Sequence, residues 1–73
     1  MKQDTKKLAQ KLKKIAMKEQ DPQISRQHML DEVEMAEMLM ASKERLSPVT
    51  IHKKVRRELS KILPNSILTM IEE

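Results

Sequence analysis

The sequence contains no cysteine, no glycine and no aromatic residue among its 73 positions. Without cysteine there can be no disulfide bond, no thiol nucleophile and no cysteine-ligated zinc. Without glycine, the phosphate-cradling loops of P-loop and dinucleotide-binding proteins are excluded, because their backbone approaches the ligand where a Cβ would interfere. Without Phe, Trp or Tyr, the chain lacks the platforms on which the bases of single-stranded nucleic acids stack. These absences point to a binding protein, and we expect no catalytic residue, metal site, cofactor or small-molecule substrate.

The size and apolar content favour a small helical protein that associates with itself. A chain of this length forms one domain, here residues 1–73, with residues 1–20 as a candidate basic helical arm. Its apolar residues are aliphatic or Met, so the large burials that aromatic side chains supply are missing. We therefore expect a dimer, or a chain that is stable only with a partner. The lack of cysteine agrees with a cytoplasmic location, and no segment approaches the ~20 apolar residues of a membrane span.

Charge is segregated along the chain. Residues 1–18 carry a net charge of +6, residues 19–44 carry −5 and residues 45–61 carry +5, within an overall net charge of +4. One interpretation is that an acidic helix lies between two basic helices and neutralises them in a bundle. The other is that the basic segments face an anionic partner. Both interpretations remain open from the sequence, and they are compatible.

The pattern of apolar residues predicts an all-α protein, because no segment alternates apolar and polar residues as a strand does. We expect a small bundle of three main helices and a short C-terminal helix. The first helix is predicted over about residues 4–19, with Asp4 or Thr5 as its N-cap. The short C-terminal helix is predicted to start with Asn65 or Ser66 as its cap.

Proline marks the boundaries of the second and third helices. Asp21-Pro22 combines an N-cap residue with the helical position that proline prefers, and it predicts a helix that runs to about Arg45. Ser25 is a second possible cap. Ser47-Pro48 repeats this signal and predicts a third helix to about Leu63. Pro64 ends that helix, because the residue before a proline is disfavoured in helical geometry.

The second helix carries more apolar surface than one neighbouring helix covers. At about 100° per residue, one face holds Met29, Val33, Ala36 and Met40. We assign this face to the core. The apolar surface continues around the helix through Met35, Leu39 and Met38. Because methionine repacks readily against a partner, we predict that these three residues form a dimer or partner interface.

The third helix has an apolar side and, on its opposite side, a cationic one. The apolar side holds Ile51, Val55, Leu59, Ile62 and Leu63. The cationic side holds Lys53, Lys54, Arg56, Arg57 and Lys61. Like charges on one helical face repel by a few tenths of a kcal/mol per neighbouring pair, so acids within the fold or phosphates outside it must offset them. Arginine is the planar, bidentate donor that suits phosphates and guanine edges.

The segment EMAEMLMASKERLSPVTIHKKVRREL, residues 34–59, resembles a helix-turn-helix DNA-binding unit, and its end, SPVTIHKKVRREL, resembles a recognition helix. The resemblance implies that Ala36 and Leu39 pack in the supporting helix and that Ile51 and Val55 point inwards. The connection would run through residues 42–46, and Met40 or Ala41 stands where such units usually have glycine. The side chains implied to face the DNA groove and its phosphates are Ser47, Val49, Thr50, His52, Lys53, Arg56 and Arg57.

The sequence thus predicts a non-enzymatic regulatory protein that binds duplex DNA. The predicted nucleic-acid-binding residues are Ser47, Thr50, His52, Lys53, Arg56, Arg57 and Lys61. The alternative is a protein–protein interaction module, such as an adaptor, an inhibitor or a chaperone-like protein, whose partner docks on the Met-rich second helix. The two hypotheses place the partner on different helices.

Overall fold

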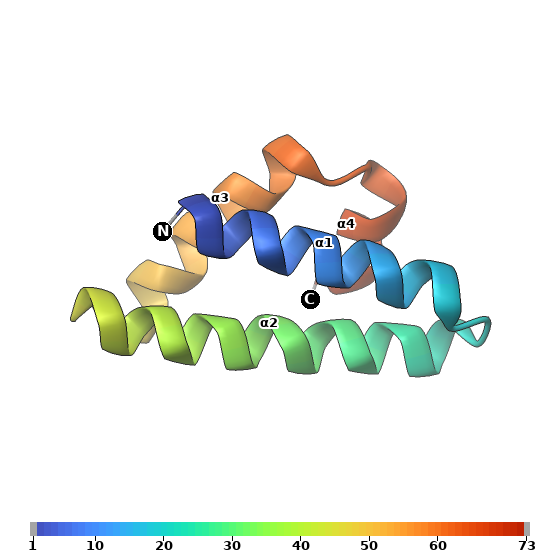
Figure 1. The fold of residues 1–73 in the computed structure, drawn as a ribbon, viewed down its shortest axis with the longest axis horizontal. Coiled ribbons are helices and arrows are strands. Elements are labelled where there is room, and N and C mark those ends of the chain that lie inside the picture. The colour runs from blue at the N-terminus through green and yellow to red at the C-terminus, as the bar shows by residue number, and fades with distance from the viewer. Residues whose placement is uncertain (1, 73) are drawn as a thin grey trace.

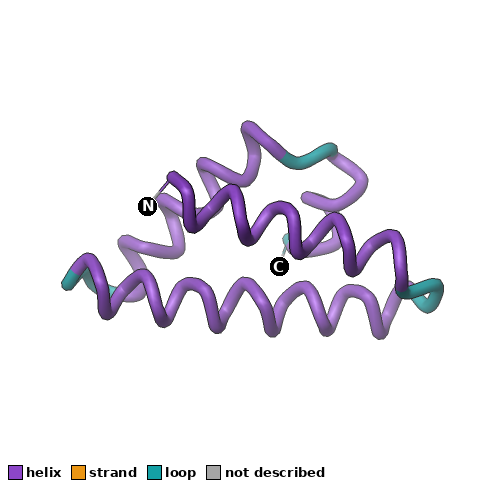
Figure 2. Tube along the Cα trace, in the orientation of Figure 1, coloured by secondary structure: helices purple, strands orange, loops and turns teal. Residues whose placement is uncertain are grey.

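The computed structural model describes residues 2–72, which form four helices joined by short loops (Figures 1 and 2). The helices are α1 (Lys2–Lys18), α2 (Pro22–Glu44), α3 (Pro48–Ile62) and α4 (Asn65–Ile71). Helices α1 and α2 lie side by side and run in opposite directions, and α3 and α4 cover one side of this pair (Figure 1). There is no strand between residues 2 and 72, so the predicted all-helical bundle is confirmed.

The predicted starts of α2 and α3 are both confirmed. Asp21 is the N-cap of α2, and its Oδ1 accepts hydrogen bonds from the N–H groups of Gln23 and Ile24, at 2.9 and 3.4 Å. Ser47 is the N-cap of α3, and its Oγ accepts a hydrogen bond of 3.2 Å from the Thr50 N–H. These side chains satisfy amide groups that the first turn of a helix leaves without a partner.

The predicted N-caps of α1 and α4 are wrong. Helix α1 begins at Lys2, so Asp4 and Thr5 lie inside its first turns. The Asp4 carboxylate binds the Lys43 ammonium of α2 at 3.3 Å, and Thr5 is buried. Helix α4 follows Pro64 without any side-chain cap, so neither Asn65 nor Ser66 has the predicted role.

The core draws on all four helices and is aliphatic apart from two methionines. It consists of Leu8, Ala9, Leu12, Met29, Val33, Met40, Ile51, Val55, Leu59, Leu63, Ile67 and Ile71. The inward faces that the periodicity predicts for α2 and α3 are therefore confirmed, with Ala36 packed against the core while half-buried. Ile62 is an exception, because 36% of its surface stays exposed where the third helix ends. No helix among residues 2–72 is both long and apolar enough to cross a membrane.

The connection between α2 and α3 agrees with the predicted helix boundaries and is shorter than the helix-turn-helix resemblance implies. Helix α2 continues through Glu44, so only residues 45–47 join the two helices. Arg45 ends α2 with φ 55° and ψ 39°, in the left-handed region, and its N–H donates to the Ala41 carbonyl. The left-handed position thus falls at Arg45 rather than at Met40 or Ala41. A three-residue connection lies within the range of helix-turn-helix units.

We expect Arg45→Gly to raise the free energy of unfolding by about 0.5–1 kcal/mol. Left-handed geometry costs a residue with a Cβ roughly 1–2 kcal/mol of folding free energy, and glycine avoids this cost. The larger entropy of glycine in the unfolded chain offsets part of that gain in stability. Urea unfolding followed by circular dichroism measures the change. Arg45→Ala is the matched control, because it removes the same side chain and keeps the Cβ. Equal stability of the glycine and alanine variants would contradict the prediction.

Candidate nucleic-acid interface

Helix α3 presents a row of exposed cations to solvent. Its buried side chains Ile51, Val55 and Leu59 are 0% exposed and fix the orientation of the helix. On the exposed side lie Lys53, Lys54, Arg57 and Lys61, which we call the cationic face of α3. Of these four, only Lys61 forms an ion pair with another residue in the range 2–72. Its partner is Glu58 of the same helix, at 3.8 Å.

His52 lies on the flank of α3 and binds α2. Its Nδ1 is 2.9 Å from Oε1 and 2.8 Å from Oε2 of Glu37. Because a carboxylate only accepts hydrogen bonds, the ring Nδ1–H is the donor. The Glu37 side chain is 13% exposed, so this contact is partly shielded from water. His52 therefore connects the third helix to the acidic second helix.

Arg56 lies beside His52 and is half-buried. It lines a hollow of about 370 Å³ with His52, Ser60, Leu68 and Glu72, between α3 and α4. Its Nε is buried and has no hydrogen-bond partner in the part of the chain that the structure describes. Arg56 is thus separated from the exposed row that contains Arg57, its neighbour in the sequence.

Ser47 and Thr50 form the start of α3. The Ser47 Oγ lies 2.9 Å from the Thr50 Oγ1, and the same Oγ accepts from the Thr50 N–H. Both hydroxyls therefore engage in local hydrogen bonds. The seven predicted binding residues fall into three groups: the exposed cations Lys53, Arg57 and Lys61, the start of the helix, and the flank formed by His52 and Arg56. The structure adds Lys54, which the sequence pattern already places on the cationic side.

Of the packing positions that the helix-turn-helix resemblance implies, those of α3 are buried and one of α2 is not. Ile51 and Val55 point inwards as implied. Leu39, which the resemblance implies is a packing position, is 64% exposed, whereas its neighbour Met40 is 2% exposed. The helix packs through Val33 and Met40, which places Leu39 about 100° away from the centre of the contact.

The outer face of α2 consists of Met35, Met38 and Leu39, with exposed fractions of 59%, 67% and 64%. Met35 and Leu39 line a hollow of about 310 Å³ between α1 and α2, together with Lys7 and Lys11 of α1. A second hollow contains Met35 and Met38 beside Asp31, Glu32 and Glu34. An exposed apolar patch thus lies between lysines on one side and carboxylates on the other.

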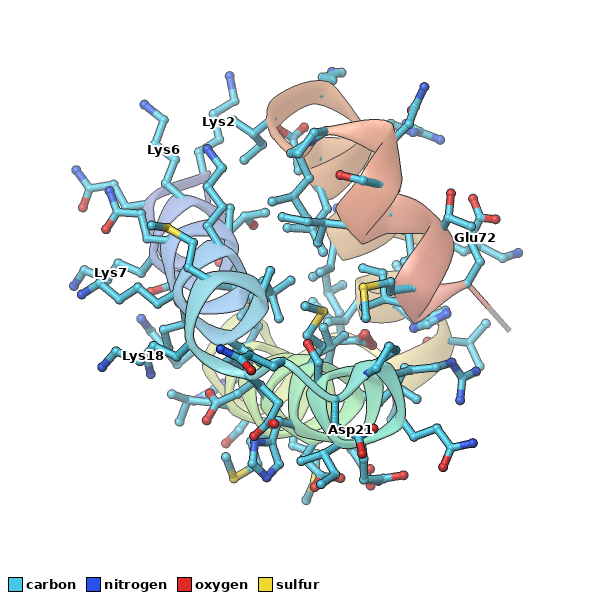
Figure 3. All side chains as sticks on the ribbon, turned by 90° about the vertical axis from the view of Figure 1, so that its right-hand side faces the viewer. Lys2, Lys6, Lys7, Lys18, Asp21 and Glu72 are labelled. Carbon is cyan, nitrogen blue, oxygen red and sulfur yellow. The ribbon has the colours of Figure 1, made fainter. Side chains whose placement is uncertain are left out.

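Within residues 2–72, two ion pairs join α1 to α2. Lys11 of α1 pairs with Glu32 of α2 at 3.9 Å, and Lys43 of α2 pairs with Asp4. In Figure 3, Lys6, Lys7 and Lys18 extend from the side of α1 opposite to α4. Asp21 lies in the loop after α1, and Glu72 follows the last residue of α4. The bundle therefore neutralises only part of the charge on its basic helices.

Comparisons with known proteins give no relative: no family model, no curated protein and no solved structure matches this chain. Within residues 2–72, no three acidic or histidine side chains gather closely enough to hold a metal ion.

Proposed function

We propose that the protein binds duplex nucleic acid through the cationic face of α3 and acts as a small regulatory factor. The observation that carries this proposal is the exposure of four cations within three turns of one helix, three of them without an ion-pair partner among the described residues. Helix α3 has 15 residues and is about 22 Å long. A helix of this size fits the major groove of duplex DNA.

Phosphates relieve the repulsion between these cations. Each phosphate contact releases condensed counterions and makes binding depend on salt, with a slope of about −0.9 per contact in a plot of log K against log salt concentration. Four contacts give a slope of roughly −3 to −4. Lysines act here as point charges, whereas the Arg57 guanidinium offers the bidentate geometry that reads guanine.

The remaining predicted residues support α3 rather than extend its contact surface. Ser47 and Thr50 fix the start of the helix, and His52 ties its flank to Glu37. Arg56 lies in the hollow against α4. We therefore assign the contacts with phosphates and bases to Lys53, Lys54, Arg57 and Lys61, and we assign positioning to the other four residues. The proposed factor is a dimer, as the small size of the chain favours.

The test replaces two cations that lie one turn apart on the exposed row. Lys53→Gln combined with Arg57→Gln should weaken binding to random duplex DNA roughly tenfold to a hundredfold at ~0.1 M salt, because two phosphate contacts are lost. The slope of log K against log salt should become shallower by about 2. Fluorescence anisotropy across a salt series measures both quantities.

The matched control is Lys6→Gln combined with Lys13→Gln, which removes the same charge from exposed positions of α1. Lys6 extends from the side of α1 opposite to α4 (Figure 3). The control should lower the affinity much less, because it removes only long-range attraction. Absence of any binding by the unchanged protein at ~50 mM salt, where phosphate contacts are strongest, would overturn the proposal.

The outer face of α2 favours a second candidate function. Three apolar side chains that are each more than half exposed form a surface on which an amphipathic helix of another protein can dock. In that function, the cations of α3 would raise solubility and the rate of association. The DNA titration separates the two candidates, because a protein-binding module would show neither the steep salt dependence nor the specific effect of Lys53 and Arg57.

A further inference from the structure

We infer that the outer face of α2 binds a second copy of this chain, in a two-fold dimer in which α1 of each copy lies against α2 of the other. This inference does not depend on nucleic-acid binding. It rests on the exposed apolar patch, on the lysines beside it and on the register between α1 and α2.

The apolar patch is continuous but too small to hold a dimer by itself. Met35, Met38 and Leu39 are spaced by three and four residues, so their side chains are neighbours on the helix surface. A standard interface buries about 800 Å² from each partner, which three half-exposed side chains do not supply. The neighbouring surface of α1 must therefore take part, and the contact has to extend across the whole α1–α2 pair.

The surface of α1 beside this patch is a line of lysines. Lys7, Lys11, Lys14 and Lys18 recur at intervals of four and three residues, and they line the two hollows between α1 and α2. The corresponding surface of α2 is acidic, with Asp31 and Glu34 beside Met35 and Met38. Each copy thus carries both halves of a complementary pair, which is what a two-fold interface requires.

The register of the helices brings these opposite charges together. Helix α1 runs antiparallel to α2. The ion pairs Asp4–Lys43 and Lys11–Glu32 show which residues of the two helices lie at the same height along the helix axes. Lys14 is one turn beyond Lys11, so it lies within one turn of the level of Asp31.

A two-fold axis parallel to both helices places α1 of one copy over α2 of the second. Each residue keeps its height along the axis, so residues at equal heights in the two copies face one another. Lys14 of one copy then faces Asp31 of the second copy, and the patch of each copy lies against the lysine line on α1 of the other, whose aliphatic stems cover it. Because the axis repeats every contact, this pair of charges occurs twice. An axis that placed α2 against α2 would also place α1 against α1, and it would oppose the lysines of one copy to those of the other, which is unfavourable.

The first measurement is the mass of the full-length protein by sedimentation equilibrium across a concentration series. We expect a monomer–dimer equilibrium that Met35→Lys combined with Met38→Lys shifts fully to monomer. Met17→Lys is the control, because Met17 is 84% exposed on α1. It lines none of the three hollows that contain the patch or the lysine line. Circular dichroism verifies that each variant keeps its helices. A parent protein that stays monomeric would overturn the inference, including the case in which the patch instead captures a different protein.

The second measurement tests the pairing of α1 with α2 by exchanging charges. Lys14→Glu and Asp31→Lys should each shift the equilibrium towards monomer, because each single variant opposes like charges twice across its own interface. Mixing the two variants should restore a dimer, since each charged residue then meets an opposite charge in the other chain. An effect on the fold within one chain cannot produce restoration by mixing. Failure of the mixture to dimerise, with a dimeric parent, would overturn the proposed arrangement.

Discussion

Replacing Met29 by alanine should lower the free energy of unfolding by about 2–5 kcal/mol. Met29 is 0% exposed and packs in the core, where the lost side chain leaves a cavity that the surrounding helices fill only in part. A domain of 73 residues has a total stability of roughly 4–11 kcal/mol, at 0.05–0.15 kcal/mol per residue. The variant should therefore lose a large part of its stability, and urea unfolding followed by circular dichroism measures the loss.

Met17→Ala provides the control, because it is the same chemical change at a position that is 84% exposed. It should alter the free energy of unfolding by less than about 0.5 kcal/mol. The comparison isolates burial from the small difference in helix propensity between methionine and alanine. Similar losses in the two variants would show that Met29 is not part of the core.

Ile71→Ala should release α4 from the bundle and lower the free energy of unfolding by about 2–5 kcal/mol. Helix α4 has seven residues, and a helix of this length is not stable by itself in water. Its attachment depends on Ile67 and on Ile71, which is 0% exposed. Loss of the second anchor should expose the backbone of the helix to solvent.

Amide hydrogen exchange measured by NMR distinguishes release of α4 from general destabilisation. Residues 65–71 should exchange much faster in the variant than in the parent, and the amides of α2 should remain the best protected. Ile24→Ala is the matched control, because Ile24 is 46% exposed in the first turn of α2. Uniform acceleration along the whole chain would contradict a separate role for Ile71.

The helix boundaries that the sequence predicts well depend on neighbouring residues. Asp21 and Ser47 bind amides two or three positions further along, so the sequence contains every group that takes part. Asp4 has the same chemistry as Asp21, yet its carboxylate binds Lys43, which is 39 positions away. A proline follows Asp21 and not Asp4, but the sequence around Asp4 does not reveal its partner, because that contact depends on the packing of α1 against α2.

The candidate site shows the same division between local and distant information. The helical period places Lys53, Arg57 and Lys61 opposite the buried side of α3, and the structure leaves all three exposed. The period cannot show that Glu37 of α2 binds His52 or that Arg56 lines a hollow with Leu68 of α4. The period does place Met40 in the core and Leu39 outside it, whereas the resemblance implies that Leu39 packs.

The position of α3 relative to the outer face of α2 determines how two chains can engage DNA. Helix α3 packs on the side of α2 that holds Val33 and Met40, whereas Met35 and Met38 point away from it. Two chains joined through their outer faces would carry their cationic surfaces back to back. Such a pair cannot read two adjacent half-sites on one side of a duplex. It would instead bridge separate DNA segments, so binding would bring distant parts of a molecule together.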